Sequence, residues 1–444
     1  MTLFNWKNKK ETAQRDLAWV DEFISNVRPY IFVREEDCLL IKRPNQAQKL
    51  NASGAKILRA LLSGMPMARL LDRIADSPEK AREISDFLRA VRQYVDGELD
   101  RFSANPAVEA QPFTANFNAL PVLSEVALTY RCNLRCAFCY AGSGCAANPT
   151  GSSAEMSADA CRRVLWKIRH QARVPSVSFT GGEPTLAPHL PDMIRYAKTL
   201  DMRVNLITNG TRITPDAARR FAEVGLDSAQ VSLEGVTPET HDALVGASGA
   251  FEKTVAAVTS LKSAGIHTHT NTTITRRNLA ECAALPAFVK RTFGADRFSM
   301  NLMIPTGSGA IHDDLLVPYR EIGAHVEQML AASQQAGVEF LWYSPVPMCL
   351  FNSISAGLGN KGCSACDGLL SVGANGDVLP CASYDAPVGN LAAQDFADIW
   401  HSSLARRFRE KQFAPPSCRA CEHFAICNGA CPLYWRKIGY HELE

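Results

Sequence analysis

The stretch that decides the fold is SEVALTYRCNLRCAFCY, residues 124–140, in which an apolar run leads directly into three closely spaced cysteines. A short run such as SEVALTY is typical of a β-strand. Cys132, Cys136 and Cys139 follow it with the spacing C-x3-C-x2-C. Three thiolates this close together can bind three corners of an iron–sulfur cubane and leave the fourth iron without a protein ligand.

An open iron predicts a specific chemistry. It can take the amino and carboxylate groups of S-adenosylmethionine (SAM), so that one electron from the reduced [4Fe-4S] cluster breaks a carbon–sulfur bond. The protein then has to bind and orient SAM, and it has to exclude water from the site. The alternative is a structural zinc site, for which Cys145 would supply the fourth ligand.

Composition sets the broad class. A chain of 444 residues predicts two or three domains, and 46% hydrophobic with 21% charged residues is ordinary for a soluble protein. The start, MTLFNWKNKKETAQRD, has no apolar segment typical of a secretion signal, so we expect a cytoplasmic protein. A net charge of +2 gives no argument for nucleic acid or membrane partners. Fifteen cysteines in a reducing compartment then indicate metal binding.

The pattern along the chain predicts three domains. Residues 1–105 are predicted to contain a hairpin (29–42), a helix capped by Asn51 and a helix from about 78 to 95, and residues 106–121 to form a linker. Residues 122–337 alternate strands and helices, which indicates a parallel α/β sheet, and six units make a partial (β/α)6 TIM-type barrel. Residues 338–444 form a metal-organised module. The six predicted strands are 124–130, 176–181, 203–210, 228–235, 267–275 and 297–304.

The chain from about residue 121 to 310 resembles the radical SAM superfamily. The resemblance rests on the C-x3-C-x2-C motif with Phe138 before its last cysteine, and on FTGGEPTL (179–186) at the second strand's end. It implies that this GGEP motif meets the methionine amino group of SAM, because glycines let backbone approach a ligand and a carboxylate offsets an ammonium. A tight turn is the alternative. The GGEP residues are Gly181, Gly182, Glu183 and Pro184.

Two weaker motifs match family positions at strand ends. ITNGT (207–211) and VSLEG (231–235) offer Asn209, Ser232 and Glu234 to the ribose or carboxylate of SAM, although TNG is equally a common turn. His241 and Asp242 match a recurring pair. Val245 stands where relatives often have Arg, so the pair's role stays open between structural and substrate-facing.

The last hundred residues resemble a SPASM domain, an auxiliary iron–sulfur module. Its patterns are C-x9-G-x4-C around Gly376 and C-x2-C-x5-C-x3-C. The resemblance implies one or two auxiliary clusters, the first held by Cys366, Cys381 and Cys431 with Cys363 or Cys349, the second by Cys418, Cys421 and Cys427. The family usually has a seventh cysteine after these, which this sequence lacks, so the unused upstream cysteine, His441, Glu442, water or substrate could complete the second cluster. Zinc knuckles are the alternative. The module's cysteines are Cys349, Cys363, Cys366, Cys381, Cys418, Cys421, Cys427 and Cys431.

Residues from about 25 to 100 resemble the PqqD-type domain that recognises precursor peptides, most clearly in the L-N-x-x-G-x-x-I-L run from Leu50 to Leu58. The resemblance implies that an extended leader peptide adds a strand to an exposed sheet edge. A winged-helix-like α+β fold without peptide binding is the alternative.

Together these features predict a radical SAM peptide maturase. It would abstract hydrogen from a residue of a ribosomally made precursor peptide, with an external electron donor of the flavodoxin or ferredoxin type. One alternative is a radical SAM enzyme acting on a haem precursor or maturing a protein as sulfatase maturases do. Another is a zinc-structured or electron-transfer protein. No general acid or base can be named from the sequence, and we expect the scattered Cys38, Cys145, Cys161 and Cys282 to be small buried side chains.

Overall fold

The computed structural model describes residues 17–43, 46–96, 118–141 and 155–444. Within them the chain forms two compact units, the first ending at Val122 and the second beginning at Leu123. Most of the predicted linker (106–121) and Cys145 lie outside the described residues. Within the described residues, no helix combines the length and apolar composition needed to span a membrane.

The first unit combines helices with a three-stranded antiparallel sheet of order β1-β2-β3. The predicted hairpin is confirmed, with Ile31 paired to Lys42 and Arg34 to Leu39. Strand β3 was not predicted from the sequence, because QAQK has no apolar residue larger than alanine and so lacks the pattern of a strand. The elements are α2 (Val20–Val27), β1 (Ile31–Arg34), β2 (Leu39–Lys42), β3 (Gln46–Lys49), α3 (Ala52–Leu62), α4 (Met67–Ile74) and α5 (Pro78–Asp96).

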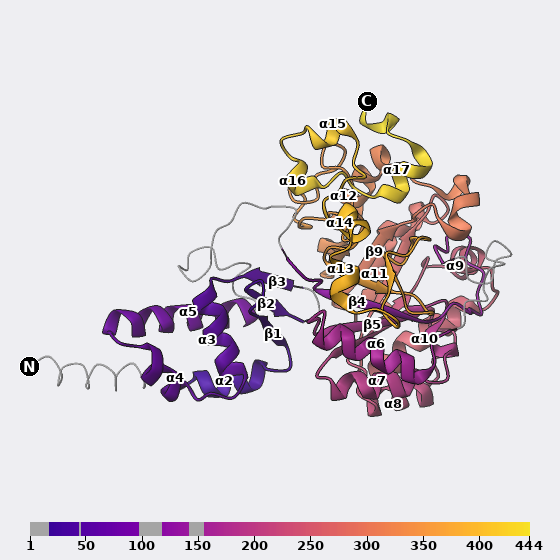
Figure 1. The fold of residues 1–444 in the computed structure, drawn as a ribbon. Coiled ribbons are helices and arrows are strands. Elements are labelled where there is room, and N and C mark those ends of the chain that lie inside the picture. The colour runs from indigo at the N-terminus through magenta and orange to yellow at the C-terminus, as the bar shows by residue number, and fades with distance from the viewer. Residues whose placement is uncertain (1–16, 44–45, 97–117, 142–154) are drawn as a thin grey trace, which may run out of the picture. The chain divides into compact units, whose positions relative to one another are not determined.

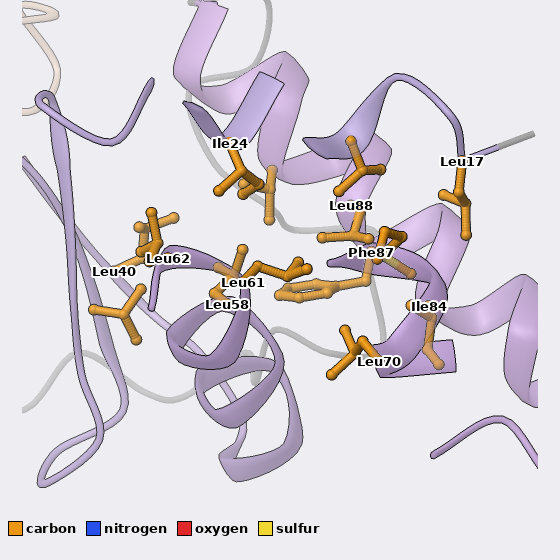
Figure 2. Close-up of a cluster of buried hydrophobic side chains, with 14 of the residues drawn as sticks. Leu17, Ile24, Leu40, Leu58, Leu61, Leu62, Leu70, Ile84, Phe87 and Leu88 are labelled. Carbon is orange, nitrogen blue, oxygen red and sulfur yellow. The ribbon is translucent and has the colours of Figure 1, made fainter. Parts of the chain in front are cut away.

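An apolar core holds this first unit together. Figure 2 shows Phe87 of α5 extending toward Leu58 and Leu61 of α3. Helix α3 begins as predicted, because the Asn51 side chain accepts a hydrogen bond from Gly54 N at 2.7 Å. A Cβ on Gly54 would lie 3.0 Å from the Phe87 ring, so the glycine of the L-N-x-x-G run lets α3 and α5 pack closely.

The second unit is built on one ten-stranded sheet of order β10-β9-β8-β7-β6-β5-β4-β11-β12-β13. The six predicted strands are β4 to β9, all paired in parallel as neighbours in sequence order. The strands are β4 (Leu123–Thr129), β5 (Ser176–Gly181), β6 (Arg203–Thr208), β7 (Ser228–Ser232), β8 (His267–Ile274), β9 (Arg297–Leu302), β10 (Glu339–Trp342), β11 (Leu369–Val372), β12 (Asp377–Leu379) and β13 (Gly389–Asn390).

The sheet extends past the predicted six-unit barrel at both edges. Strand β10 begins at Glu339, beyond the boundary predicted at 337, and pairs in parallel with β9. Strand β11 of the cysteine-rich module pairs in parallel with β4, and it forms the expected hairpin with β12 around Gly376. The module therefore continues the barrel sheet.

Helices pack on this sheet, with α7 against β6, α10 against β7 and β8, and α12 against β10. Ser157, Thr214 and Thr237 cap their helices by accepting backbone hydrogen bonds. Figure 1 shows α6, α7 and α8 along one side of β4 and β5, while α15, α16 and α17 gather near the C-terminus. The helices are α6 (Ala158–His170), α7 (Leu190–Thr199), α8 (Pro215–Glu223), α9 (Pro238–Val245), α10 (Ala250–Ser263), α11 (Leu285–Phe293), α12 (Tyr319–Ala336), α13 (Phe396–Trp400), α14 (Ser403–Arg409), α15 (Pro416–Arg419), α16 (Phe424–Cys427) and α17 (Pro432–Ile438).

Candidate active site and auxiliary cysteine groups

The three-cysteine loop follows β4 at the carboxyl edge of the parallel strands, where barrel sites are built. The end of α9 holds this loop in place: Arg135 N donates to Val245 O and Ala137 N to Leu244 O, each at 3.0 Å. Val245 is buried and packs with Leu134, against which Cys132 and Cys136 lie. An apolar residue at this position thus supports the loop by packing.

The three thiols lie close enough to affect one another electrostatically. Burial raises the pKa of Cys136 well above its ordinary value, and negative charge on Cys139 and Cys132 raises it further. Burial also raises the pKa of Cys132, with added contributions from Glu183 and Cys139. A cationic cluster core would relieve this repulsion by taking the thiolates as ligands.

This donor set fits a cubane better than a single ion. Among the described residues, no three His, Cys, Asp or Glu side chains are arranged to hold one metal ion. The thiolates of a [4Fe-4S] cluster each bind a different iron and are therefore spaced more widely than the ligands of one zinc. Cys132, Cys136 and Cys139 are the residues that would hold the cluster.

Glu183 ties the GGEP motif to the next strand end. Its carboxylate is fully buried. Oε1 accepts hydrogen bonds from Thr185 Oγ1 at 2.6 Å and Thr208 Oγ1 at 2.8 Å, and Oε2 accepts one from Asn209 N at 2.8 Å. Burial raises the pKa of this carboxyl, while these donors lower it. The Oε2 atom keeps capacity for a further donor such as an ammonium.

The GGEP glycines allow two backbone segments to meet. Gly181 has φ +137°, and a Cβ there would overlap Thr129 O. A Cβ on Gly182 would overlap Arg131 O and lie 2.6 Å from Tyr130 O. These glycines therefore let the end of β5 lie against the start of the cysteine loop. This close backbone packing requires glycine in addition to the ligand approach predicted from the sequence. Pro184 is buried and opens the short 3-10 helix Pro184–Leu186.

Asn209 connects the cysteine loop with the third strand end. Its Nδ2 donates to Asn133 Oδ1 at 3.1 Å and lies 3.9 Å from Cys132 Sγ, within the range of a weak N–H···S contact. Its Oδ1 accepts from Thr211 N at 2.9 Å. The structure thus brings Cys132, Glu183 and Asn209 into one continuous network.

Glu234 and Ser232 lie at the end of β7. Glu234 is only 1% exposed, and burial raises its pKa to about 8 although Thr273 N donates to its Oε2 at 2.8 Å. Its charge also raises the pKa of Cys136 in the cysteine loop. Ser232 pairs with Asn271 across β7 and β8 and is half-buried.

The described contacts of His241 and Asp242 are structural. His241 Nδ1 accepts from Glu234 N at 3.0 Å, which puts the ring proton on Nε2. Asp242 accepts from Gly249 N at 2.6 Å and Phe251 N at 2.9 Å, at the start of α10. His241 therefore fixes the strand end that carries Glu234, and Asp242 fixes the start of α10.

The loop after β9 also contributes to the site, although none of its residues was predicted to belong there. Gly307 has φ +54°, and a Cβ there would overlap Cys139 O and Tyr140 O. Ser308 N donates to Cys139 O at 2.8 Å. Phe138 packs with the buried Met303 just after the same strand. The signal that could have found this loop is TGSG at 306–309, a glycine-rich turn at a strand's carboxyl end.

A small pocket lies between the cysteine loop and the auxiliary module. Glu125 of β4 lines it together with Tyr140 and Thr180. The Glu125 carboxylate accepts from Ser371 Oγ of β11 at 2.7 Å, and burial raises its pKa. The charge of Glu125 adds a small increase to the pKa of Cys381, which burial already raises. Glu125 thus joins β4 to β11 at this pocket.

Four cysteines of the C-terminal module form a first auxiliary group, made of Cys363, Cys366, Cys381 and Cys431. Burial raises the pKa of Cys381 well above its ordinary value, with added contributions from Cys363 and Cys431. Cys363 likewise raises the pKa values of Cys366 and Cys431. Cys366 N donates to Pro380 O at 3.0 Å, beside Cys381. Of the two upstream cysteines left open by the sequence, Cys363 is the one whose charge raises the pKa values of the other three.

A second auxiliary group is made of Cys349, Cys418, Cys421 and Cys427. Burial raises the pKa of Cys418, and the charges of Cys427, Cys349 and Cys421 raise it further. Cys349 is similarly affected by Cys427 and Cys421. By these mutual effects on their pKa values, the eight module cysteines fall into two sets of four.

Of the two C-terminal candidates for a ligand, Glu442 is used elsewhere. Glu442 Oε2 accepts from Arg320 N at 2.9 Å, and its Oε1 accepts from Tyr434 OH. His441 is exposed, and its carbonyl accepts from Arg320 Nη2 at 3.2 Å. Of the scattered cysteines, Cys161 and Cys282 are fully buried as predicted, while Cys38 is partly buried in the β1–β2 turn.

Comparisons with known proteins agree with this geometry. The model of the radical SAM superfamily matches residues 126–284, and the model of the SPASM iron–sulfur cluster-binding domain matches residues 363–422. Mycofactocin maturase MftC of Mycobacterium tuberculosis is 30% identical over 320 residues, which cover 70% of this chain and 78% of that protein. The AdoMet-dependent heme synthase of Methanosarcina barkeri is 29% identical over 328 residues, or 70% of this chain and 90% of that one.

Among solved structures, Streptococcus suis SuiB bound to its precursor peptide SuiA superposes with a TM-score of 0.67. The match covers 92% of this chain and 96% of SuiB at 18% identity, and thus concerns the fold. The predicted partial barrel, the SAM cofactor and the iron–sulfur clusters are confirmed. The chain belongs to the radical SAM superfamily and carries a C-terminal SPASM domain.

Proposed function

We propose that this chain is a peptide maturase that abstracts hydrogen from a residue of a ribosomally made precursor peptide. When bound, the cluster and SAM supply a 5′-deoxyadenosyl radical. Cys132, Cys136 and Cys139 hold the cluster, while Glu183 and Asn209 orient SAM beside it. The two auxiliary cysteine groups would hold iron–sulfur clusters, which supply an acceptor for the electron that the substrate loses. An external flavodoxin or ferredoxin would supply electrons to the first cluster.

The observation that supports a peptide substrate is the free edge of β3 in the first unit. Among the described strands, β3 pairs only with β2. Leu50 N donates to the carbonyl oxygen of Cys38, the residue that flanks β2. In an antiparallel pair, hydrogen-bonded and non-hydrogen-bonded residue pairs alternate, so the backbone N–H and C=O groups of Gln48 and Gln46 also point toward β2. The backbone groups of Ala47 and Lys49 therefore point outward, where an extended peptide can add a strand.

Exposure favours β3 over the other edge of the same sheet. All four residues of β1 are buried, whereas Gln46 is exposed and the rest of β3 is half-buried. The likeness to the SuiB structure covers 92% of this chain, so it must include most of the first unit. That structure contains a precursor peptide.

SAM cleavage tests the enzymatic part of the proposal. The full chain is reconstituted anaerobically with iron and sulfide, reduced with dithionite and given SAM. We expect 5′-deoxyadenosine from the wild type and from the buried-cysteine control Cys282→Ala, and none from Cys139→Ala. A wild-type protein that binds only zinc and forms no 5′-deoxyadenosine would refute it.

Peptide capture tests the substrate class. The probe is a synthetic peptide copying a short reading frame beside the gene. Ala47→Pro removes an outward N–H from β3 and should weaken binding about tenfold or more, since proline also opposes strand pairing. Ala47→Val keeps the N–H and should bind normally. Equal binding by both variants, or no mass change in the peptide after turnover, would contradict a maturase.

A haem precursor is the second candidate substrate, and the 29% identity to a heme synthase over 90% of that relative favours it. The same turnover assay separates the two. Modification of an added haem precursor, with the peptide left unchanged, would assign the chain to small-molecule chemistry.

A further inference from the structure

Cys349 lies in a tight turn shortly after β10, well before the C-x2-C-x5-C-x3-C pattern. Leu350 N and Phe351 N both bond to Pro347 O at 2.9 Å, which shapes the turn. Phe351 packs on α12, where a Cβ on Gly323 would lie 3.2 Å from its ring. The turn is thus anchored to the barrel's last helix.

This turn touches the C-terminal cysteine pattern directly. Met348 N donates to Cys427 Sγ with 3.4 Å between the two atoms. Cys427 ends α16, and Cys421 N bonds to Cys418 O at 3.0 Å, so these three cysteines belong to one compact backbone segment. Cys349 is therefore the neighbour that the turn delivers to this segment.

We propose that Cys349 is the fourth ligand of the second auxiliary [4Fe-4S] cluster, completing a four-thiolate site with Cys418, Cys421 and Cys427. The ligand enters from the segment before the SPASM patterns, whereas the family usually supplies it after them. The inference deepens the proposed function, on which it rests for the role of that cluster.

Two of the other candidate ligands, Cys363 and Glu442, already have partners. Cys363 belongs to the first auxiliary group, and its carbonyl accepts from the buried Lys411 Nζ at 2.6 Å. Both Glu442 oxygens are bonded to the start of α12 and to Tyr434. Four thiolates also match the usual ligand set of a [4Fe-4S] cluster.

Thiol footprinting tests the assignment without substitution. Cys349 and Cys421 are exposed, so iodoacetamide should alkylate both in the metal-free full chain. In the anaerobically reconstituted chain we expect Cys349 to be protected together with Cys418, Cys421 and Cys427, as read by mass spectrometry. Rapid alkylation of Cys349 while the other three stay protected would overturn the proposal, as would a site that takes no iron.

Iron counting and EPR on variants give an independent readout. Three cubanes correspond to about 12 irons per chain. Cys349→Ala and Cys421→Ala should each lose up to about four irons or show the signal of a three-iron cluster, and Cys349→Ser, which keeps an oxygen donor and the side-chain size, should alter the EPR of the same cluster. The matched control Cys282→Ala should keep the wild-type spectrum.

The outcomes separate this inference from the proposed function. A Cys349→Ala protein with wild-type iron and EPR, or a loss seen instead in His441→Ala, would overturn the ligand assignment. A wild-type chain with full iron that leaves every peptide unmodified would overturn the maturase function and leave the ligand assignment standing.

Discussion

Glu183 and Asn209 are joined by a hydrogen bond from Asn209 N to Glu183 Oε2 at 2.8 Å, which links the second and third strand ends of the barrel. Asn209 in turn reaches Asn133 in the cysteine loop. One buried carboxylate therefore organises the backbone around the proposed SAM site.

We expect Glu183→Gln to weaken SAM binding about 10- to 100-fold, because an amide places a donor where the carboxylate accepts, at about 1.5–3 kcal/mol per lost charged hydrogen bond. Equilibrium dialysis of SAM with the reconstituted protein measures this. Glu281→Gln is the control, since Glu281 also accepts several hydrogen bonds, from Val236 N and Thr237 Oγ1, but does not touch the cysteine loop. An equal loss in both variants would mean that the effect is only structural.

Gly182→Ala should displace the cysteine loop and lower iron binding at the first cluster. The new Cβ would overlap Arg131 O, and backbone atoms cannot move aside cheaply. Gly368→Ala is the matched control, because its nearest atom would be 3.9 Å away. Iron content and the EPR signal perturbed by SAM report the difference, and a normal first cluster in Gly182→Ala would contradict the close-approach argument.

Lys411→Met should destabilise the second unit by about 3 kcal/mol, the usual scale for breaking a buried ion pair. Lys411 is fully buried, and its Nζ lies 3.0 Å from Asp367 Oδ2. Lys437→Met removes a more exposed pair with Asp313 and should cost at most about 1 kcal/mol. Urea unfolding compares the two variants, and similar midpoints would show that Lys411 adds little.

Acid should destabilise the chain in part through His241. Burial lowers the pKa of this imidazole to about 4, from an ordinary 6.5. Between these pH values the imidazole binds a proton in the unfolded chain but not in the folded chain. Its contribution to the free energy of unfolding is therefore fully present above about pH 6.5 and is lost as the pH drops toward 4. The free energy of unfolding is expected to be about 2 kcal/mol lower at pH 5 than at pH 7.5 because of this group.

His241→Asn should remove this part of the acid sensitivity, since its amide oxygen can still accept from Glu234 N. The exposed His401→Asn should leave the sensitivity unchanged. The measurement is the shift in urea midpoint between pH 7.5 and pH 5 for each protein. Identical shifts in all three would rule out His241 as a source.

Several features of this protein could be predicted from local sequence alone. The spacing of Cys132, Cys136 and Cys139, the apolar run before them and the GGEP motif lie within short segments, so their chemistry is readable without knowing what packs against them. The alternation of strands and helices from β4 to β9 is local in the same sense, because each unit carries its own apolar period and helix caps.

Only the tertiary structure decided which distant segments meet. Strands β3 and β10 were missed and β11 was not placed, since a strand's pairing partner lies elsewhere in the chain and four residues carry little periodic signal. The sharing of eight cysteines between two groups depends on a turn at Cys349 packing against α12 and α16, contacts that no spacing encodes. The need for glycine at 182 and 307 likewise arises from backbone atoms of the cysteine loop, which come close only after folding.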